Sequence, residues 1–183
     1  RDNRLSDEAK KSFDEAQKRY ESITSKEAEF ERQHLARYGL AMCLFKKGEI
    51  DKAQEQLEKI PAGDRTGEIS YASYLHADCL LRKCPAEVKG ATQVRELLGN
   101  LENVCNQLDS FISVNPKAPE IPEAMLKLGT SQARRGSFIK EAQERGQVLQ
   151  TARQTLENLM KQFPKEPAAT HAILERAKVM ALQ

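Results

Sequence analysis

One short pattern recurs four times along the chain and constrains the fold more than any other feature. Each copy has a small residue, a large apolar residue two places later, Ala or Gly three places further, and a small or modest residue two places after that. At about 3.6 residues per turn, the small residues fall close together on one helical face, where a neighbouring helix can approach closely. The copies are Ala36-x-Tyr38-x2-Ala41-x-Cys43, Ala72-x-Tyr74-x2-Ala77-x-Cys79, Ala124-x-Leu126-x2-Gly129-x-Ser131 and Ala172-x-Leu174-x2-Ala177-x-Val179. Recurrence of this kind predicts a stacked array of helical hairpins.

A second pattern alternates with the first and predicts the other helix of each hairpin. It places apolar residues four and then three positions apart, as in Ala16, Tyr20 and Ile23, then Ala53, Leu57 and Ile60, then Val104, Leu108 and Phe111, then Ala152, Leu156 and Leu159. The expected helices are 6–23, 25–47, 50–60, 67–83, 86–115 (with Gly99 as a candidate break), 121–135, 138–163 and 167–182. Thr24 and Glu27 have capping-box spacing and are expected to begin the second of these. No segment shows the alternation of a β-strand.

Composition and charge narrow the class of protein. Hydrophobic residues make up 39% and charged residues 31% of the 183 residues, which is typical of a globular chain. The net charge of +2 comes from 29 basic and 27 acidic residues spread over the whole length, which predicts no nucleic-acid partner. No apolar run approaches the roughly 20 residues of a membrane span. The chain begins Arg-Asp-Asn and stops after one helix of a fourth unit, so we expect a segment of a longer protein. Any targeting signal would lie outside this segment, which leaves the compartment, cytoplasmic or periplasmic, open.

The residue types that carry chemistry form no catalytic or metal-binding pattern. Cys43 and Cys79 occupy the same place in two copies, which favours buried free thiols over disulfides or metal ligands. His76-x-Asp78-Cys79 resembles part of a metal site, but no second ligand cluster accompanies it, so a structural or exposed histidine is favoured. There is no Gly-rich phosphate loop, nucleophile elbow or His-Glu-x-x-His. We therefore predict no enzymatic activity, metal or other cofactor.

The run Leu40-Ala41-x2-Leu44-x3-Gly48-x-Ile50-x2-Ala53-x3-Leu57-x2-Ile60 resembles the signature of the tetratricopeptide repeat family. Leu128-Gly129, with Gly136 and Phe138, fits the same signature, whereas the second copy departs from it by having Cys84 at the glycine position. Elongated repeats that end in Phe-Pro or Asn-Pro look like bacterial members related to outer-membrane assembly lipoproteins. The resemblance covers nearly the whole chain.

This resemblance implies an all-α fold, a right-handed α-solenoid of antiparallel helix hairpins forming a superhelix. Residues 1–183 would be a single repeat array. Its expected parts are the second helix of a partial repeat at about 1–30, a repeat at 31–62, repeats with insertions at 67–116 and 120–164, and the first helix of a truncated repeat at 167–183.

The resemblance also implies a binding surface, because the first helix of each pair lines a concave groove that takes peptides or protein segments. The groove positions carried over onto this sequence are Tyr38, Met42, Lys46, Tyr71, Tyr74, Asp78, Arg82, Thr130, Arg134 and Lys178. Some members bind a C-terminal carboxylate through a clamp of Lys, Asn and Arg. The clamp positions here hold Tyr38, Met42, Leu75, Glu123 and Lys127, which argues against a chaperone-tail receptor.

Three cations occupy one equivalent repeat position, so stacking should align Lys46, Arg82 and Arg134 as a basic strip along the groove. Next to Tyr71 and Tyr74, such a strip would favour an acidic peptide with apolar anchors. Two alternatives remain open. Cations in the last turn of a helix also oppose its dipole, and the tyrosines can simply pack between repeats.

These observations support a non-enzymatic scaffold that binds a peptide or protein in the groove. A structural or self-associating segment of a larger repeat protein is the first alternative, since the apolar face of the final helix needs a cover. An accessory domain of an enzyme encoded elsewhere in the full chain is the second.

Overall fold

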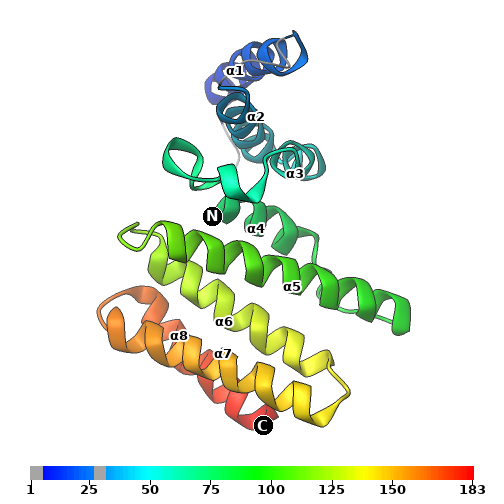
Figure 1. Cartoon of the computed structure of the whole chain (residues 1–183), viewed down its shortest axis with the longest axis vertical. Helices are drawn as coiled ribbons and strands as arrows, with labels where there is room; N and C mark the ends of the chain where they lie inside the picture. The colour runs from blue at the N-terminus through cyan, green and yellow to red at the C-terminus, as the bar shows by residue number, and fades with distance from the viewer. Residues whose placement is uncertain (1–5, 27–31) are drawn as a thin grey trace. The chain divides into compact units, whose positions relative to one another are not determined.

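The computed structural model describes residues 6–26 and 32–183, and within these ranges its regular structure is entirely helical (Figure 1). The α-helices in these ranges are α1 (Asp7–Lys26), α2 (Gln33–Lys47), α3 (Ile50–Glu58), α4 (Ala72–Lys83), α5 (Ala91–Val114), α6 (Ile121–Phe138), α7 (Ala142–Gln162) and α8 (Pro167–Leu182). Two short 3-10 turns, Ala62–Asp64 and Gly67–Ile69, connect α3 to α4. The predicted all-α fold is confirmed.

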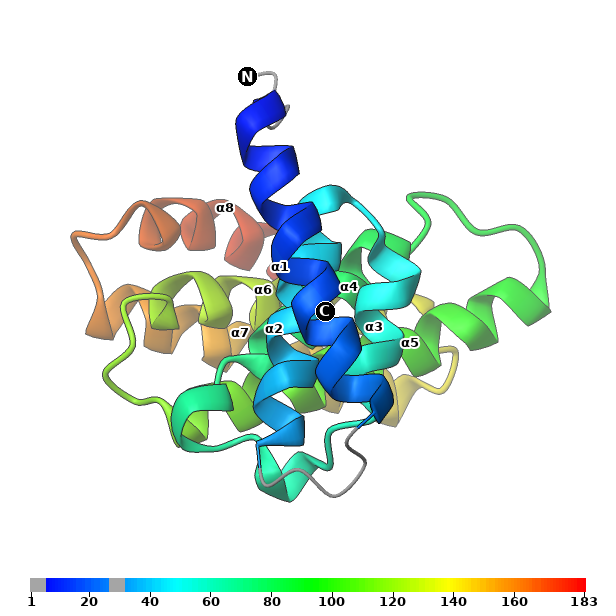
Figure 2. The ribbon, with the colours of Figure 1, turned by 90° about the horizontal axis from the view of Figure 1, so that it is seen from above.

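The helices form two compact units, Arg1–Cys79 and Leu80–Gln183, and the division falls inside α4. In the first unit α1 packs along α2, and α2 packs along α3; Figure 2 looks onto α1 where it lies against α2. In the second unit α6 lies between α5 and α7, and α8 contacts both α6 and α7 (Figure 1). Within each unit, these consecutive helices therefore lie side by side, as in a stack of hairpins.

The core of the first unit is built from the apolar faces of α2 and α3. Leu44, Leu57 and Ile60 are buried there together with Cys79. Tyr20 of α1 packs against this cluster. A Cβ added at Gly39 would lie 2.4 Å from the Cζ atom of Tyr20, so the glycine allows the tyrosine ring to rest on the backbone of α2.

The core of the second unit follows the second sequence pattern. Val104, Leu108 and Phe111 of α5 are fully buried, and so are the equivalent residues of α7, Ala152, Leu156 and Leu159. A Cβ at Gly129 of α6 would lie 2.7 Å from Cγ of Leu156. Close approach of α6 to α7 thus depends on the glycine at this position of the repeated motif.

The first sequence pattern is also matched by burial. Its small residues, from Ala36 and Ala41 to Ala124 and Gly129, are buried in every copy but the last. In the last copy Ala177 is exposed, because among the described residues no helix packs against that side of α8.

The predicted start of the second helix is wrong. α1 continues to Lys26, and α2 begins only at Gln33. Thr24 lies within the last turns of α1, where its hydroxyl donates to the carbonyl oxygen of Glu21 at 3.3 Å. A hydroxyl satisfied by the preceding turn does not cap the next helix. Glu27, the other half of the expected capping box, lies outside the described residues.

Three further helix boundaries differ from expectation. The helix expected from 67 begins as a 3-10 turn, and α4 starts at Ala72. The helix expected from 86 starts at Ala91, after Gly90 with a φ of 86°, and runs unbroken through Gly99. α6 continues to Phe138, so α7 begins at Ala142 rather than 138. At that start the carboxylate of Glu141 accepts hydrogen bonds from the amides of Gln143 and Glu144 and caps the helix.

Candidate partner-binding surface

Three predicted groove residues form a stripe along α2. Tyr38, Met42 and Lys46 follow one another at intervals of four residues and therefore share a helical face. The ring of Tyr38 is half-buried against the core of the first unit, Met42 is 40% exposed, and Lys46 is exposed. Lys46 has no ion-pair partner among the described residues. The stripe thus passes from an anchored aromatic ring to an exposed thioether and an available cation.

The predicted residues in and near α4 are more enclosed. Tyr71 lies just before the helix, and Tyr74 and Asp78 lie on one of its faces; all three are half-buried. Arg82 is exposed in the last turn. Each of these four side chains already takes part in a hydrogen bond or in a ring or electrostatic interaction. A partner bound here would have to share or displace those contacts.

The predicted residues of α6 and α8 are largely engaged within their own unit. The Thr130 hydroxyl donates to the carbonyl oxygens of Leu126 and Lys127 at 2.9 and 3.0 Å. The guanidinium of Arg134 donates to the carbonyl oxygen of Pro85 and so ties α6 to the segment that follows α4. Lys178 is exposed and pairs with Glu175 at 2.7 Å. Arg134 therefore has a structural role in addition to any contact with a partner.

Helix dipoles explain only part of the predicted basic strip. Lys46 and Arg82 lie in the last turns of α2 and α4, where a cation opposes the dipole. Arg134 does not lie in the last turn, because α6 extends to Phe138. Lys46 belongs to the first unit and the other two cations to the second. The alignment of the three along a groove stays a prediction.

Sequence reasoning missed Arg65, which lies between two of the expected helices. The side chain is 5% exposed, and its Nη2 atom donates to the carbonyl oxygens of Leu57 and Ile60 at 2.9 and 3.0 Å. Its Nη1 atom lies 3.3 Å from Nδ1 of His76, which is itself buried. Burial lowers the pKa of the guanidinium, against an opposing effect of Glu58. Arginine stays protonated in proteins, so Arg65 acts as a buried cationic cap at the C-terminal end of α3.

The cysteines have the properties of packing residues. Cys43 and Cys79 are buried and free, as predicted. Burial raises the pKa of the Cys43 and Cys84 thiols, and burial together with the nearby Asp109 raises the pKa of Cys105 to about 12. These three thiols are therefore protonated at neutral pH and poor nucleophiles. Within residues 6–26 and 32–183, no three His, Cys, Asp or Glu side chains are grouped to hold a metal ion.

Comparison of the sequence with known protein families agrees with the paired helices and their small-residue contacts. Models of the tetratricopeptide repeat match residues 8–79 and 123–166, which together make up more than half of the chain. The chain belongs to the tetratricopeptide repeat family. The second match contains α7 and most of α6, whereas α5 lies outside both matches, next to the copy in which Cys84 replaces the family glycine.

Comparison with solved structures gives the same fold. The chain is similar to a putative kinesin light chain from Podosopora anserina with nearly identical TPR-like repeats, with a TM-score of 0.56 and 13% sequence identity. The alignment covers 94% of this chain and 79% of that one. The predicted all-α tetratricopeptide solenoid is thereby confirmed. No curated protein matches the sequence.

Membership of the family indicates the general role. Tetratricopeptide repeats are generally non-enzymatic modules for protein–protein interaction, so the chain is a scaffold with protein partners. In the part of the chain that the structure describes, every helix is too short or too polar to cross a membrane. The likeness to outer-membrane assembly lipoproteins stays a prediction.

Proposed function

We propose that this tetratricopeptide array binds an acidic peptide with apolar anchors through its predicted groove residues. The observation that carries the proposal is the stripe of Tyr38, Met42 and Lys46 on α2. An exposed thioether adapts to different apolar side chains. The unpaired ammonium one turn further on attracts a carboxylate.

The preorganised backbone supports the same function. Tyr38 is held against the core of the first unit, so binding orders few side chains at this end of the stripe. A rigid surface loses little conformational entropy when a peptide docks, which leaves more of the contact energy as affinity. Helical repeats therefore suit the recognition of short segments.

Charge reversal at two positions tests this proposal. Because Arg134 holds the Pro85 carbonyl, the variant is limited to Lys46→Glu with Arg82→Glu. We expect peptides selected from a random displayed library on the unmodified chain to bind this variant at least tenfold more weakly, measured by fluorescence polarisation.

The matched control carries the same change in net charge elsewhere. Lys117 and Lys161 are exposed cations without an ion-pair partner among the described residues, so Lys117→Glu with Lys161→Glu should bind like the unmodified chain. Circular dichroism checks that all variants are equally helical. Equal loss in both variants would mean that net charge alone causes the effect, and it would contradict binding through the predicted groove residues.

A second candidate role, self-association, is favoured by one observation on α8. Four large apolar side chains are 46 to 59% exposed there: Ile173, Leu174, Met180 and Leu182. Ile173 and Met180, seven residues apart, share one face of α8, and an exposed apolar patch of this kind usually marks an interface. If it joins copies of the chain, sedimentation velocity will show concentration-dependent association that Ile173→Lys with Met180→Lys abolishes. A monomer at all concentrations would exclude this role.

A further inference from the structure

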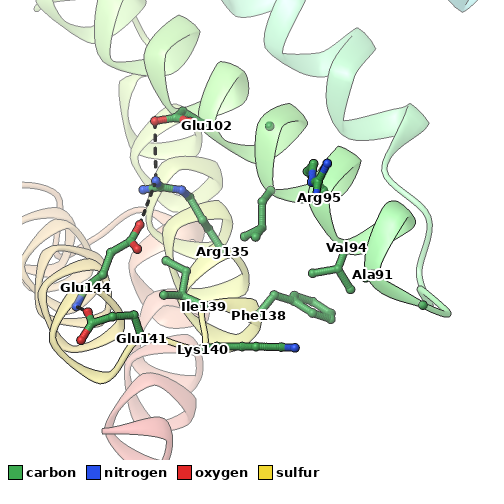
Figure 3. A pocket seen from close by; sticks show the side chains of 13 residues that line it. Ala91, Val94, Arg95, Glu102, Arg135, Phe138, Ile139, Lys140, Glu141 and Glu144 are labelled. Carbon is green, nitrogen blue, oxygen red and sulfur yellow. Dashed lines mark hydrogen bonds and ion pairs between the residues drawn. The ribbon is translucent and has the colours of Figure 1, made fainter.

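The second unit contains a pocket of about 640 Å³ that none of the predicted groove residues lines (Figure 3). It opens between the first three turns of α5, the end of α6, and the loop and first turn of α7. Its apolar surface comes from Val94, Leu98, Phe138 and Ile139. A pocket of this size is within the range that accommodates a bulky side chain with its flanking backbone.

A glycine borders the pocket on the α5 side. Gly99 lies in the interior of α5, is exposed, and would have no atom within 4 Å of an added Cβ. Glycine in a helix interior costs about 0.5–1 kcal/mol relative to alanine. At Gly129 that cost accompanies close packing against Leu156, but at Gly99 nothing packs. A side chain added at position 99 would therefore start in open space at the border of the pocket.

Three cations and three carboxylates line the pocket, and two of the cations are unpaired within the described part of the chain. Arg135 bridges two of the three carboxylates, with Nη2 3.6 Å from Glu102 and 3.7 Å from Glu144 (Figure 3). The third, Glu141, accepts the amide hydrogen bonds at the start of α7, and these lower its pKa. The remaining cations, Arg95 and Lys140, have no partner among the described residues. In the view of Figure 3, Val94 and Phe138 lie between them.

We propose that this pocket is a second docking site, for an acidic peptide that inserts one bulky apolar side chain between Arg95 and Lys140. The apolar walls bury the inserted side chain, and carboxylates on either side of it pair with the two cations. In many interfaces a few side chains buried in desolvated pockets contribute most of the binding energy, and charged residues surround them at the rim. The site is independent of the stripe on α2.

Filling the pocket from α5 provides the test. A Cβ added at Gly99 meets no neighbouring atom, so Gly99→Phe introduces a ring at the border of the pocket without a clash at Cβ. Gly146→Phe is the matched control, because Gly146 is also an exposed glycine in a helix with open space around it, and it does not line the pocket. A random library of displayed 12-residue peptides is selected on the unmodified full chain, and the selected peptides are synthesised with a fluorophore.

The proposal expects a class of peptides with Leu, Phe or Met flanked by Asp or Glu. Peptides of this class should bind Gly146→Phe like the unmodified chain and Gly99→Phe at least tenfold more weakly. Arg95→Glu with Lys140→Glu should weaken them to the same extent, and this variant keeps the test valid if Gly99→Phe loses helicity. Lys46→Glu with Arg82→Glu should leave their binding unchanged.

Three results would overturn the pocket as a docking site. One is that selection yields no peptide of this class. Another is that such peptides bind Gly99→Phe, at full helicity, as tightly as the Gly146→Phe control. The third is that their binding depends only on Lys46 and Arg82, in which case the stripe on α2 is supported and the pocket is not.

Discussion

Arg65→Met is expected to lower the free energy of unfolding of the Arg1–Cys79 unit by about 3 kcal/mol, because two buried carbonyl oxygens lose a charged donor. The guanidinium bonds the carbonyl oxygens of Leu57 and Ile60 at the end of α3. Methionine fills similar space but donates no hydrogen bond, and the site is enclosed, since the arginine is 5% exposed.

Hydrogen exchange resolved by peptide is the measurement for this variant, since the two units need not unfold together. Protection should fall across α3 (Ile50–Glu58) and stay unchanged in α6 and α7. Arg19→Met is the control, because Arg19 is exposed on α1 and has no partner among the described residues; its effect should stay within about 0.5 kcal/mol. Equal effects of the two substitutions would mean that Arg65 does not cap α3.

Gly129→Val is expected to destabilise the Leu80–Gln183 unit by about 3 kcal/mol, the upper part of the range for overpacking a rigid core. Even the Cβ atom would lie 2.7 Å from Cγ and Cδ2 of Leu156, a side chain that is fully buried and has nowhere to move. The gain in helix propensity over glycine, below about 1 kcal/mol, is too small to offset this clash.

Thermal unfolding followed by circular dichroism measures this effect, with Gly146→Val as the control because that position is open. The sharper test is the double variant Gly129→Val with Leu156→Ala. Leu156→Ala alone should cost about 3 kcal/mol through the cavity it leaves. The valine partly fills that cavity. The loss of unfolding free energy in the double variant should therefore be smaller than the sum of the two single losses by at least about 1 kcal/mol. Additive effects would show that the two residues do not meet.

The sequence alone predicts the helices of this protein and their inward faces because periodicity is a local property. Small residues such as Ala41 and Ala124, and apolar triplets such as Val104, Leu108 and Phe111, recur at the period of the helix, and all are buried. The same regularity carried the resemblance to tetratricopeptide repeats. It does not determine helix ends, because a capping residue such as Thr24 can satisfy its hydroxyl in the preceding helix instead.

Only the tertiary structure shows which residues have particular structural roles within these helices and loops. Arg65 reads as a loop cation, and its burial depends on α3 and α4 meeting around it. Gly99 and Gly129 both read as glycines within helical patterns, yet Gly129 meets Leu156 and Gly99 borders an open pocket. The neighbours of a residue across a fold come from distant parts of the chain, and the local pattern around that residue carries no information about them.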